Sequence, residues 1–336
     1  MSPEQPPQPS LLAIEGLAVE FKTRDGMARV IDDLSVALAP GETLGVVGES
    51  GCGKSMTALA VMGLVPIPPG QIAAGRILLD GENLLEASEL RMREVRGNEI
   101  SMIFQEPMTS LNPVYSVGNQ IAETARLHEG LSAREARDRA VEMLYQVGIP
   151  APEKRVAEFP HQLSGGMRQR VMIAMALTCR PRVLIADEPT TALDVTVQAQ
   201  IFDLLRALQA DNGTSIIMIT HDMGAIAEMA QRVVVMYAGR KVEEGPVDEI
   251  LANPKHPYTQ GLIVCVPHLL AEPPAQRQPL MEIPGVVPAL TELGKAGCPF
   301  APRCAQAMER CRQAMPPPHD VRPGHVAACW LLEEAA

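Results

Sequence analysis

Eight residues near the start of the chain have the spacing of a phosphate-binding loop. The segment Gly48-Glu-Ser-Gly-Cys-Gly-Lys54-Ser55 fits the pattern G-x-x-x-x-G-K-[ST] and lies between an expected strand and an expected helix. Its glycines let the backbone turn tightly, so that amides can point at phosphate oxygens. Lys54 is expected to bridge the β- and γ-phosphates, and the Ser55 hydroxyl to bind Mg²⁺. The predicted nucleotide-binding residues of this loop are Gly48, Ser50, Gly51, Gly53, Lys54 and Ser55.

Two acids end an apolar segment further along the chain, Val183-Leu-Ile-Ala-Asp187-Glu188. Asp187, at the end of the expected strand, is placed to hold Mg²⁺ through water. Glu188 beside it can accept a proton from an attacking water molecule and orient that molecule. The alternative is a strand end with solvated acids, and the phosphate loop upstream argues against it. The two segments together predict hydrolysis of a nucleoside triphosphate.

A second anion site is predicted within Leu163-Ser-Gly-Gly-Met-Arg-Gln-Arg170. Ser164, Gly165 and Gly166 stand just before an expected helix, where free backbone amides favour anions. One chain therefore carries two phosphate-gripping elements. If both grip the same nucleotide from opposite sides, they must come from two chains that face each other head to tail.

With this segment the chain resembles the ABC ATPase family, whose signature is LSGGQ. Met167 replaces the usual Gln, at the position least critical for phosphate, and is not expected to inactivate the protein. The resemblance covers residues 11–253, with every motif in order. It implies an ATPase with ATP and Mg²⁺ as ligands, which drives a solute through separate membrane proteins.

Four further residues match family motifs one by one. Gln105 matches the glutamine that touches Mg²⁺ and water, and Asp194 matches the aspartate that links the two ATP sites. His221 matches the switch histidine that contacts the γ-phosphate. Phe21 matches the aromatic residue that stacks on adenine only in rough position. Because it lies on an alternating apolar strand face, a role in the core is the alternative.

Four of the seven cysteines crowd the end of the chain, at Cys298, Cys304, Cys311 and Cys329. In a reducing compartment such a group favours a metal or cluster site over disulfides. The spacing fits neither the usual zinc-finger pairs nor the ferredoxin runs, so reduced structural cysteines remain the alternative.

The segments around these motifs are similar to the dipeptide, oligopeptide and nickel importer ATPases. The similar stretches are Phe159–Arg170, Phe104–Pro113, His256–Thr259 and the Cys298-Pro-Phe-Ala-Pro-Arg-Cys304 tail. The resemblance implies a [4Fe–4S] cluster on the four cysteines, with a structural role in pinning the tail. Zinc and a metal-free tail remain alternatives.

The same resemblance implies the partners. They are a second ATPase chain, paralogous or identical, two transmembrane permease subunits, and an extracytoplasmic solute-binding protein. Residues 106–113 are expected to lie where a membrane subunit docks, which places the chain at the cytoplasmic face of the membrane. The solute stays open among dipeptides, oligopeptides, nickel chelates and sugars.

The elements that must position these residues predict an α/β fold. Early antiparallel strands in Leu11–Phe21, Arg29–Ile31 and Leu34–Leu38 precede a strand, Thr43–Val47, that runs into the phosphate loop. Strand–loop–helix order predicts a parallel, RecA-like P-loop NTPase core. A helical insertion is expected at about residues 106–178, with a capping box at Ser132-Ala-Arg-Glu135. The predicted divisions are a disordered tail at 1–10, an ABC ATPase domain at 11–253, and an irregular C-terminal extension at 254–336.

Composition agrees with this interpretation. The chain has 336 residues, of which 46% are apolar and 3% aromatic, as expected for an aliphatic α/β core. A net charge of −11 argues against a nucleic-acid binder that works through a basic patch. No apolar run reaches the length of about 20 residues that a membrane span needs, and the first ten residues lack the pattern of a signal peptide. The alternative functions are a soluble ABC ATPase without a transporter and a non-catalytic regulatory member of an ATPase pair.

Overall fold

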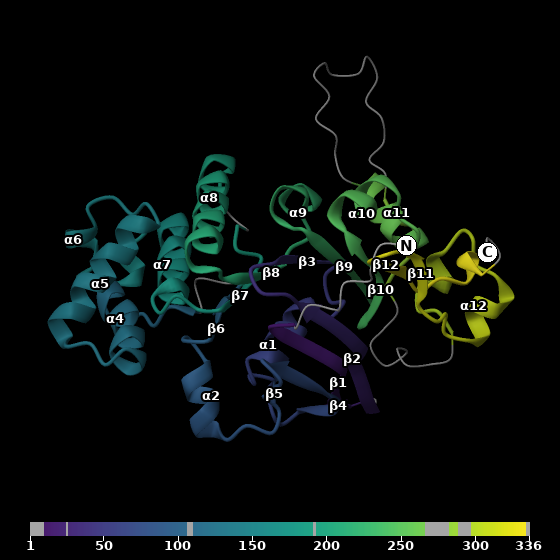
Figure 1. Ribbon diagram of the computed structural model, residues 1–336, viewed down its shortest axis with the longest axis horizontal. Coiled ribbons are helices and arrows are strands. Elements are labelled where there is room, and N and C mark those ends of the chain that lie inside the picture. The colour runs from purple at the N-terminus through teal and green to yellow at the C-terminus, as the bar shows by residue number, and fades with distance from the viewer. Residues whose placement is uncertain are drawn as a thin grey trace, which may run out of the picture.

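A computed structural model describes residues 10–24, 26–105, 110–190, 193–265, 282–287 and 297–333. The described residues form an eight-stranded mixed sheet and a four-stranded antiparallel sheet, with a helical region beside the larger sheet and the C-terminal residues at the other end (Figure 1). Most of the expected N-terminal tail, residues 1–9, lies outside the described residues, as does much of the segment from 266 to 296.

The larger sheet carries the phosphate loop. Its strand order is β11-β12-β10-β9-β3-β8-β7-β6, and the strands from β9 to β6 in that order pair in parallel. The bounds of the parallel strands are β3 Thr43–Val47, β6 Ile100–Ile103, β7 Val183–Asp187, β8 Ser215–Ile219 and β9 Arg232–Tyr237. The parallel core that the sequence predicted is therefore present, and β3 has the predicted bounds.

Apolar side chains alternate between two cores on opposite faces of this sheet. In β7, Leu184 and Ala186 belong to one core cluster, while Val183 and Ile185 belong to the other. The neighbouring strands β8 and β9 divide in the same way, because successive side chains of a strand point to opposite faces. Because both faces of the sheet pack against a hydrophobic core, nearly every residue of these strands is apolar, and each strand is a continuous apolar run in the sequence.

The smaller sheet covers one of these faces together with helix α1, Lys54–Val61. Its strand order is β2-β1-β4-β5, with bounds β1 Leu12–Thr23, β2 Gly26–Leu38, β4 Gly70–Leu79 and β5 Glu82–Asn83. The pairs β1–β2 and β1–β4 are antiparallel, as expected. The two short strands predicted between residues 29 and 38 are one strand, β2.

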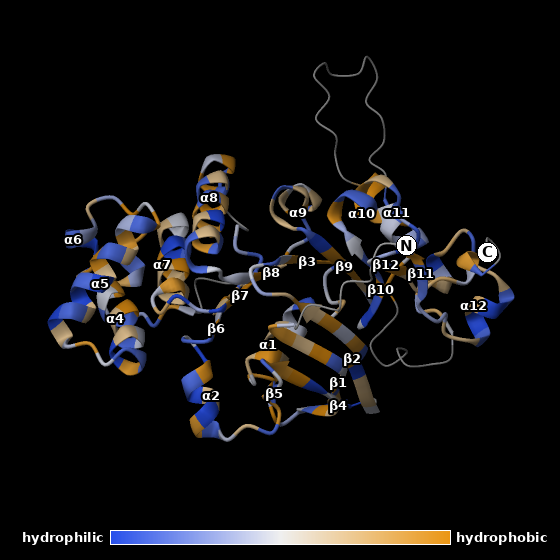
Figure 2. Ribbon diagram, viewed as in Figure 1, coloured by the Kyte–Doolittle hydropathy of each residue, from blue (hydrophilic) through white to orange (hydrophobic). Residues whose placement is uncertain are grey.

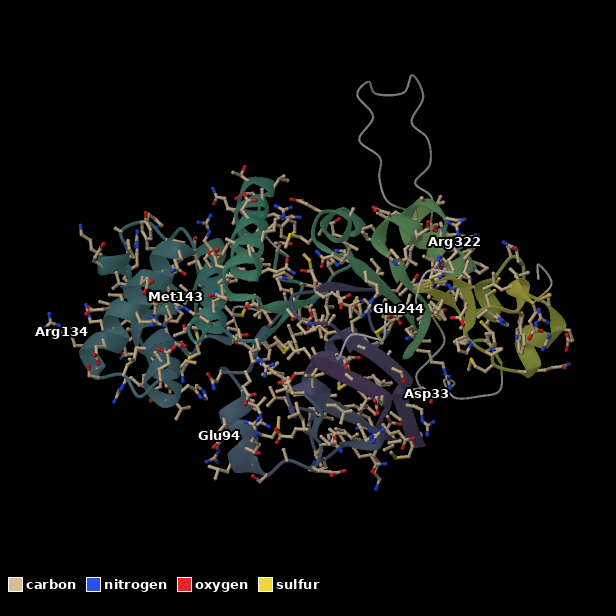
Figure 3. All side chains as sticks on the ribbon, viewed as in Figure 1. Asp33, Glu94, Arg134, Met143, Glu244 and Arg322 are labelled. Carbon is tan, nitrogen blue, oxygen red and sulfur yellow. The ribbon has the colours of Figure 1, made fainter. Side chains whose placement is uncertain are left out.

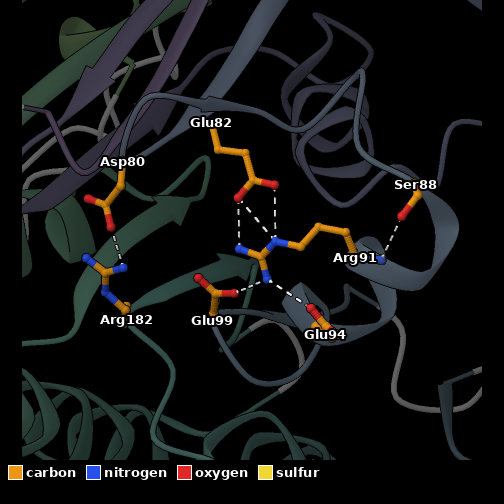
Figure 4. Close-up of polar contacts among 7 residues, drawn as sticks. All are labelled: Asp80, Glu82, Ser88, Arg91, Glu94, Glu99 and Arg182. Atoms are coloured by element: carbon orange, nitrogen blue, oxygen red, sulfur yellow. Dashed lines mark hydrogen bonds and ion pairs between the residues drawn. The ribbon is translucent and has the colours of Figure 1, made fainter.

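A cluster of ion pairs joins this region to the parallel core (Figure 4). Arg91, on helix α2, Glu89–Val95, binds Glu82 of β5 through Nε and Nη2, and its Nη1 lies 2.5 Å from a carboxylate oxygen of Glu99, just before β6. Arg182, just before β7, pairs with Asp80 at 2.5 Å. The loops at one end of two parallel strands are thereby tied to the antiparallel sheet.

The helical region lies on the other side of the parallel strands. It contains α4 Val117–His128, α5 Ala133–Gln146, α6 Pro152–Arg155, the 3₁₀ turn η1 Pro160–Gln162 and α7 Gly165–Leu177. The capping box predicted at Ser132 and Glu135 is present at the start of α5. Figure 2 shows α4 and α5 with both blue and orange segments, as amphipathic helices have. Their buried residues pack into the core with α7.

Helices α8, α9, α10 and α11 follow the later strands and precede the C-terminal residues. Their bounds are α8 Val195–Asn212, α9 Met223–Met229, α10 Val247–Ala252 and α11 Pro257–Val264. None of the described helices is both long enough and apolar enough to cross a membrane.

The C-terminal extension has more regular structure than its Pro-rich composition suggested. It contains η3 Ala301–Arg303, α12 Glu309–Gln313, β11 His319–Arg322, β12 His325–Ala327 and η4 Trp330–Leu332. Strand β12 pairs antiparallel with β10, Arg240–Pro246, which itself pairs with β9. The extension thus adds two strands to one edge of the larger sheet.

Candidate functional site

The phosphate loop connects β3 to α1 and lies close to the neighbouring strand β9. Gly48 has φ 152°, and a Cβ there would lie 2.2 Å from the backbone oxygen of Met236, so no side chain fits. Helix α1 begins after Gly53, and no side chain caps its N-terminus, so its first amides face the loop. Lys54 is buried and donates to the carbonyl oxygens of Gly48, at 2.6 Å, and Glu49, at 3.1 Å. Helix, loop amides and ammonium group together form an anion site.

Asp187 ends β7 next to this loop. Asp187 is 2% exposed and lies near Ser55, the residue after the loop lysine. Burial raises the pKa of Asp187, and the neighbouring charge of Glu188 acts in the same direction. One carboxylate oxygen, Oδ1, is buried without a hydrogen-bond partner. A buried carboxylate with an unsatisfied oxygen beside a hydroxyl group fits Mg²⁺, which takes oxygen ligands.

Gln105, Glu188 and His221 lie together although the sequence separates them widely. The amide of Gln105 donates to Oε2 of Glu188 at 3.0 Å, and Nδ1 of His221 lies 3.2 Å from Oε1 of Glu188. The Glu188 side chain is 13% exposed and that of His221 is 67% exposed. A mostly buried carboxylate held between an amide and an imidazole can orient a water molecule that enters from the solvent side.

The order of the parallel strands explains this convergence. Gln105 follows β6, Glu188 follows β7 and His221 follows β8, and these strands are neighbours in the sheet. The phosphate loop follows β3, which pairs with β8. All of these residues therefore lie at the carboxyl edge of one parallel sheet, where open α/β sheets bind ligands.

The predicted second anion site lies at the start of α7. Ser164 is exposed and caps the helix, since its hydroxyl accepts from the amide of Met167 at 3.3 Å. A Cβ at Gly165 would meet no atom within 4 Å, and one at Gly166 would lie 3.5 Å from Leu193. The tip of this segment is open to solvent and leaves space for another molecule.

Asp194 has a structural partner within its own chain. It caps α8, and its Oδ1 accepts from the amide of Val197 at 2.9 Å. Thr191 and Ala192, which precede it in the predicted motif, lie outside the described residues. So do residues 106–109 of the expected docking segment.

Phe21 lies on β1 opposite Gly70 of β4. It is half-buried and packs against the core between the smaller sheet and the larger one. A Cβ at Gly70 would lie 2.9 Å from the Phe21 ring, so the ring occupies the space above that glycine. This contact agrees with a role of Phe21 in the core. The exposed part of the ring is the part available to stack on adenine.

The four C-terminal cysteines converge on one small pocket. Cys298, Cys304, Cys311 and Cys329 line it together with His256, Phe300 and Trp330. All four are free thiols. Burial raises the pKa of Cys298 to about 11, and burial likewise raises the pKa values of Cys304 and Cys329, with the neighbouring cysteines acting in the same direction.

The sequence predicted a metal or cluster site on these four thiols. Among the described residues, no three Cys, His, Asp or Glu side chains are close enough to hold one metal ion. A mononuclear zinc site needs its ligands within about 2.3 Å of a single ion.

The motifs did not reveal several residues that contact the site. Gln169 on α7 is 1% exposed, and its amide donates to the backbone oxygen of Pro189, directly after Glu188, at 2.7 Å. The one hint in the sequence was that Gln169 is a polar residue at the start of a largely apolar helix, where a buried polar side chain needs a hydrogen-bond partner. Arg303 and Tyr258 reach Glu49 in the phosphate loop from the C-terminal part of the chain. No local pattern could indicate contacts over such separations.

Comparison with known families gives two matches along the chain. The profile of the ABC transporter family matches residues 31–191, and that of the oligopeptide/dipeptide transporter C-terminal region matches residues 242–311. A putative peptide import ATP-binding protein of Brucella abortus is 51% identical over 333 residues, covering 97% of this chain and 98% of that protein. The oligopeptide transport ATP-binding protein OppD of Bacillus subtilis is 52% identical over 326 residues, covering 97% and 90%.

Solved structures give a similar result for the fold. A dimeric ATP-binding cassette in a post-hydrolysis state, bound to ADP and Pi, matches with a TM-score of 0.64 and 25% identity. The match covers 70% of this chain and 98% of the cassette. A cassette from Clostridium perfringens, part of the ABC transporter complex cbiONQ, matches with a TM-score of 0.60 and 30% identity, covering 73% and 92%. The P-loop NTPase fold predicted from the sequence is confirmed.

Proposed function

Because the chain belongs to the ABC transporter ATP-binding proteins of the oligopeptide import type, we propose that the solute it moves is a peptide. As a member of this family it is an ATP-hydrolysing enzyme that powers transport. The match of residues 242–311 to the oligopeptide/dipeptide transporter C-terminal region carries the proposal, since that region lies outside the cassette motifs. Di- and oligopeptides are the proposed solutes, and nickel, which the family resemblance also allows, is the alternative.

The nucleotide-binding residues are proposed from the geometry of the loop. Lys54 turns from the carbonyl oxygens of Gly48 and Glu49 to the β- and γ-phosphates when ATP binds. The free amides of the loop and of the α1 N-terminus receive the phosphate oxygens. Ser55 and Asp187 would hold Mg²⁺, which would neutralise phosphate charge, and Gln105 would reach the same region from its position beside Glu188. Phe21 is proposed to offer its exposed edge to the adenine.

Water activation is proposed to use Glu188 as the general base. The Gln105 amide and the His221 ring fix the orientation of its carboxylate. His221, whose ring is largely exposed, is free to meet the γ-phosphate as the nucleotide arrives. Proton transfer from water to Glu188 then accompanies attack of the water oxygen on the γ-phosphorus, while the bond from this phosphorus to the β–γ bridging oxygen breaks and ADP leaves.

A second ATPase chain is proposed to complete each site. Ser164, Gly165, Gly166 and Met167 form an exposed helix start, suited to the phosphates of a nucleotide held by the facing chain. Asp194, at the start of α8, would link the two sites. The facing chain is a paralogue or a second copy of this chain.

The remaining partners follow from the family. Two transmembrane permease subunits and a solute-binding protein are proposed, and no nucleic acid. The chain is proposed to sit peripherally at the cytoplasmic face of the membrane, with residues 106–113 at the permease. The proposed division is a tail at 1–10, the ATPase domain at 11–253 with its helical part at about 106–178, and the extension at 254–336.

For the cysteine pocket we propose a [4Fe–4S] cluster. The pocket that the four thiols share, together with the family resemblance of the tail, supports this proposal. Cluster binding would replace the thiol protons, at a cost that burial increases by raising the pKa of Cys298, and the iron–sulfur bonds would stabilise the extension. Anaerobically purified protein should contain about four iron and four sulfide per chain. Cys304→Ser should lose both, whereas Cys179→Ser should not, and stoichiometric zinc or no metal would refute the cluster.

Peptide uptake by reconstituted vesicles tests the function. Vesicles with this chain, its partner ATPase and the permease subunits should accumulate a labelled oligopeptide only with ATP inside and binding protein outside. Lys54→Ala should abolish accumulation. ATP hydrolysis that ignores the permease would favour a soluble ABC ATPase, and accumulation of nickel without peptide would show that the proposed solute is wrong.

A further inference from the structure

Glu49, the second residue of the phosphate loop, is held at three points. Its backbone carbonyl accepts from Lys54 at 3.1 Å, and its backbone amide donates to the Tyr258 hydroxyl at 2.7 Å. Its carboxylate forms a two-point ion pair with Arg303, with distances of 2.6 Å and 3.0 Å. One loop residue therefore connects the phosphate-binding lysine to two residues that lie far along the chain.

Arg303 has every donor of its guanidinium group occupied. Nε donates to the backbone oxygen of Pro284 at 2.9 Å, and Nη2 donates to that of Ile283 at 3.1 Å as well as to Glu49. Nη1 donates to Glu49 and lies 3.4 Å from the Tyr237 hydroxyl. The side chain is 5% exposed. A fully bonded, buried guanidinium is a rigid support for the carboxylate that it binds.

The elements behind these contacts belong to the C-terminal part of the chain. Arg303 ends η3, directly before Cys304, and Tyr258 lies in the first turn of α11. The rings of Tyr258, Tyr237 and Phe300 pack together, with ring centroids 4.7 to 5.4 Å apart. The phosphate loop thus rests on an aromatic cluster that the extension helps to build.

We propose that Arg303 and Tyr258 are positioning residues for ATP binding, through which the C-terminal extension holds the phosphate loop in its binding shape. This inference rests on the proposed function. A loop whose amides are already aligned loses less freedom when it binds phosphate. Arg303 also neutralises a carboxylate that would otherwise stand uncompensated beside an incoming triphosphate.

The effect should fall on binding rather than on the chemical step. Arg303 contacts neither Gln105, Glu188 nor His221 among its hydrogen bonds. Arg303→Gln should therefore weaken ATP binding about tenfold while kcat stays within about twofold, the pattern of lost ground-state binding. Arg303→Lys should restore part of the affinity for ATP, because lysine keeps the positive charge but cannot form the two-point ion pair with Glu49.

A double-mutant cycle with ATP as the ligand tests the proposal. The dissociation constant is measured by calorimetry for the wild type, Arg303→Gln, Glu49→Gln and the double variant. If Arg303 acts through Glu49, the double variant should bind ATP no more weakly than Arg303→Gln alone. The Tm of each variant is measured as well. Weaker ATP binding at an unchanged Tm supports a positioning role, whereas weaker binding that follows a lower Tm reflects loss of the fold.

Arg322 supplies the matched control. It lies on the extension (labelled in Figure 3) and pairs with Glu249 of α10 at 2.9 Å, so it also links the extension to the rest of the chain. Arg322→Gln should leave the ATP dissociation constant unchanged. Additive losses in the cycle, or equal weakening by Arg322→Gln, would overturn the inference. A wild-type chain that fails to bind ATP would instead refute the proposed function.

Discussion

Glu188 adopts a left-handed backbone conformation, with φ 49°, which is uncommon for a residue with a side chain. Such conformations cost of order 1–3 kcal/mol and persist where the surroundings enforce them. Here the backbone amide of Glu188 donates to the carbonyl of Ile219 at 2.8 Å, and the carboxylate lies between Gln105 and His221. The fold thus holds the proposed base in a fixed place at the edge of the sheet.

Glu188→Gln should remove the base and keep the shape of the site. We expect hydrolysis to fall by about 10²-fold or more, because proton transfer contributes about 10² to 10⁴. ATP binding should persist, and the ATP-bound pair of chains should accumulate, as size-exclusion chromatography with light scattering would reveal. Turnover near the wild-type rate in this variant would rule out Glu188 as the base.

Asp187→Asn should stabilise the nucleotide-free chain although it harms catalysis. The pKa of Asp187 is raised above that of an unfolded carboxyl, so the folded state binds the proton more tightly. The free energy of unfolding therefore falls as the pH rises from the unfolded-state pKa through the folded-state pKa. At a pH above the folded-state pKa, Asp187→Asn should have a Tm about 2 °C higher than the wild type, because the variant lacks the buried charge. In acid the difference should vanish. A lower Tm for Asp187→Asn at neutral pH would contradict this.

The sequence could propose the residues at this edge of the sheet because their motifs are short and each follows a buried strand. Gln105, Glu188 and His221 come from separate motifs, and parallel strand order brings them together. The support of Glu49 by Arg303 could not be predicted in this way, since the two residues are 254 positions apart. Only the fold of the extension creates that contact.

At the scale of elements, burial on both faces made β3 and β7 easy to predict. Strand β2 was harder, because Asp32 and Asp33 resemble a turn. Asp33 indeed has φ 55°, but Asp32 is 5% exposed and pairs with Arg29 and Arg240, so the strand continues through the acids. Strands β11 and β12 are too short to show an alternation of apolar and polar residues. Their Pro-rich flanking sequence also predicts irregular structure.

The capping box of α5 permits a test that is independent of catalysis. The Ser132 hydroxyl accepts from the amide of Glu135, and the Glu135 carboxylate accepts from the amide of Ser132 at 2.9 Å. Ser132→Ala should lower the free energy of unfolding by about 1 kcal/mol, as loss of an N-cap does. Urea denaturation measures this. Ser132→Asp, which keeps a cap, is the control, and equal losses in both variants would contradict a capping role.

At the scale of the whole molecule, one chain presents two different surfaces that are proposed to bind phosphate. The phosphate loop lies at the edge of the sheet, whereas Ser164 and Gly165 stand exposed at the start of α7, in the helical region (Figure 1). Gln169 ties that helix to the backbone beside Glu188, so the two surfaces are mechanically connected. This arrangement suits a pair of chains that close over ATP and transmit closure to a membrane partner.

Gly165→Asp separates the two surfaces experimentally. A Cβ there meets no atom of the described residues within 4 Å, and an acid at a helix N-terminus is favourable, so the variant should fold. It should bind ATP at its own loop yet reduce hydrolysis by about 10²-fold, because its carboxylate repels the phosphates of the facing chain. Normal hydrolysis by pairs in which both chains carry an acid at this position would exclude the shared site.

The dependence of ATP hydrolysis on protein concentration tests the shared site most directly. The rate per chain, measured with the partner ATPase present and with the association state followed by ultracentrifugation, should rise with concentration and level off as pairs form. Chains that stay monomeric throughout and hydrolyse ATP at the full rate would contradict a site built by two polypeptides.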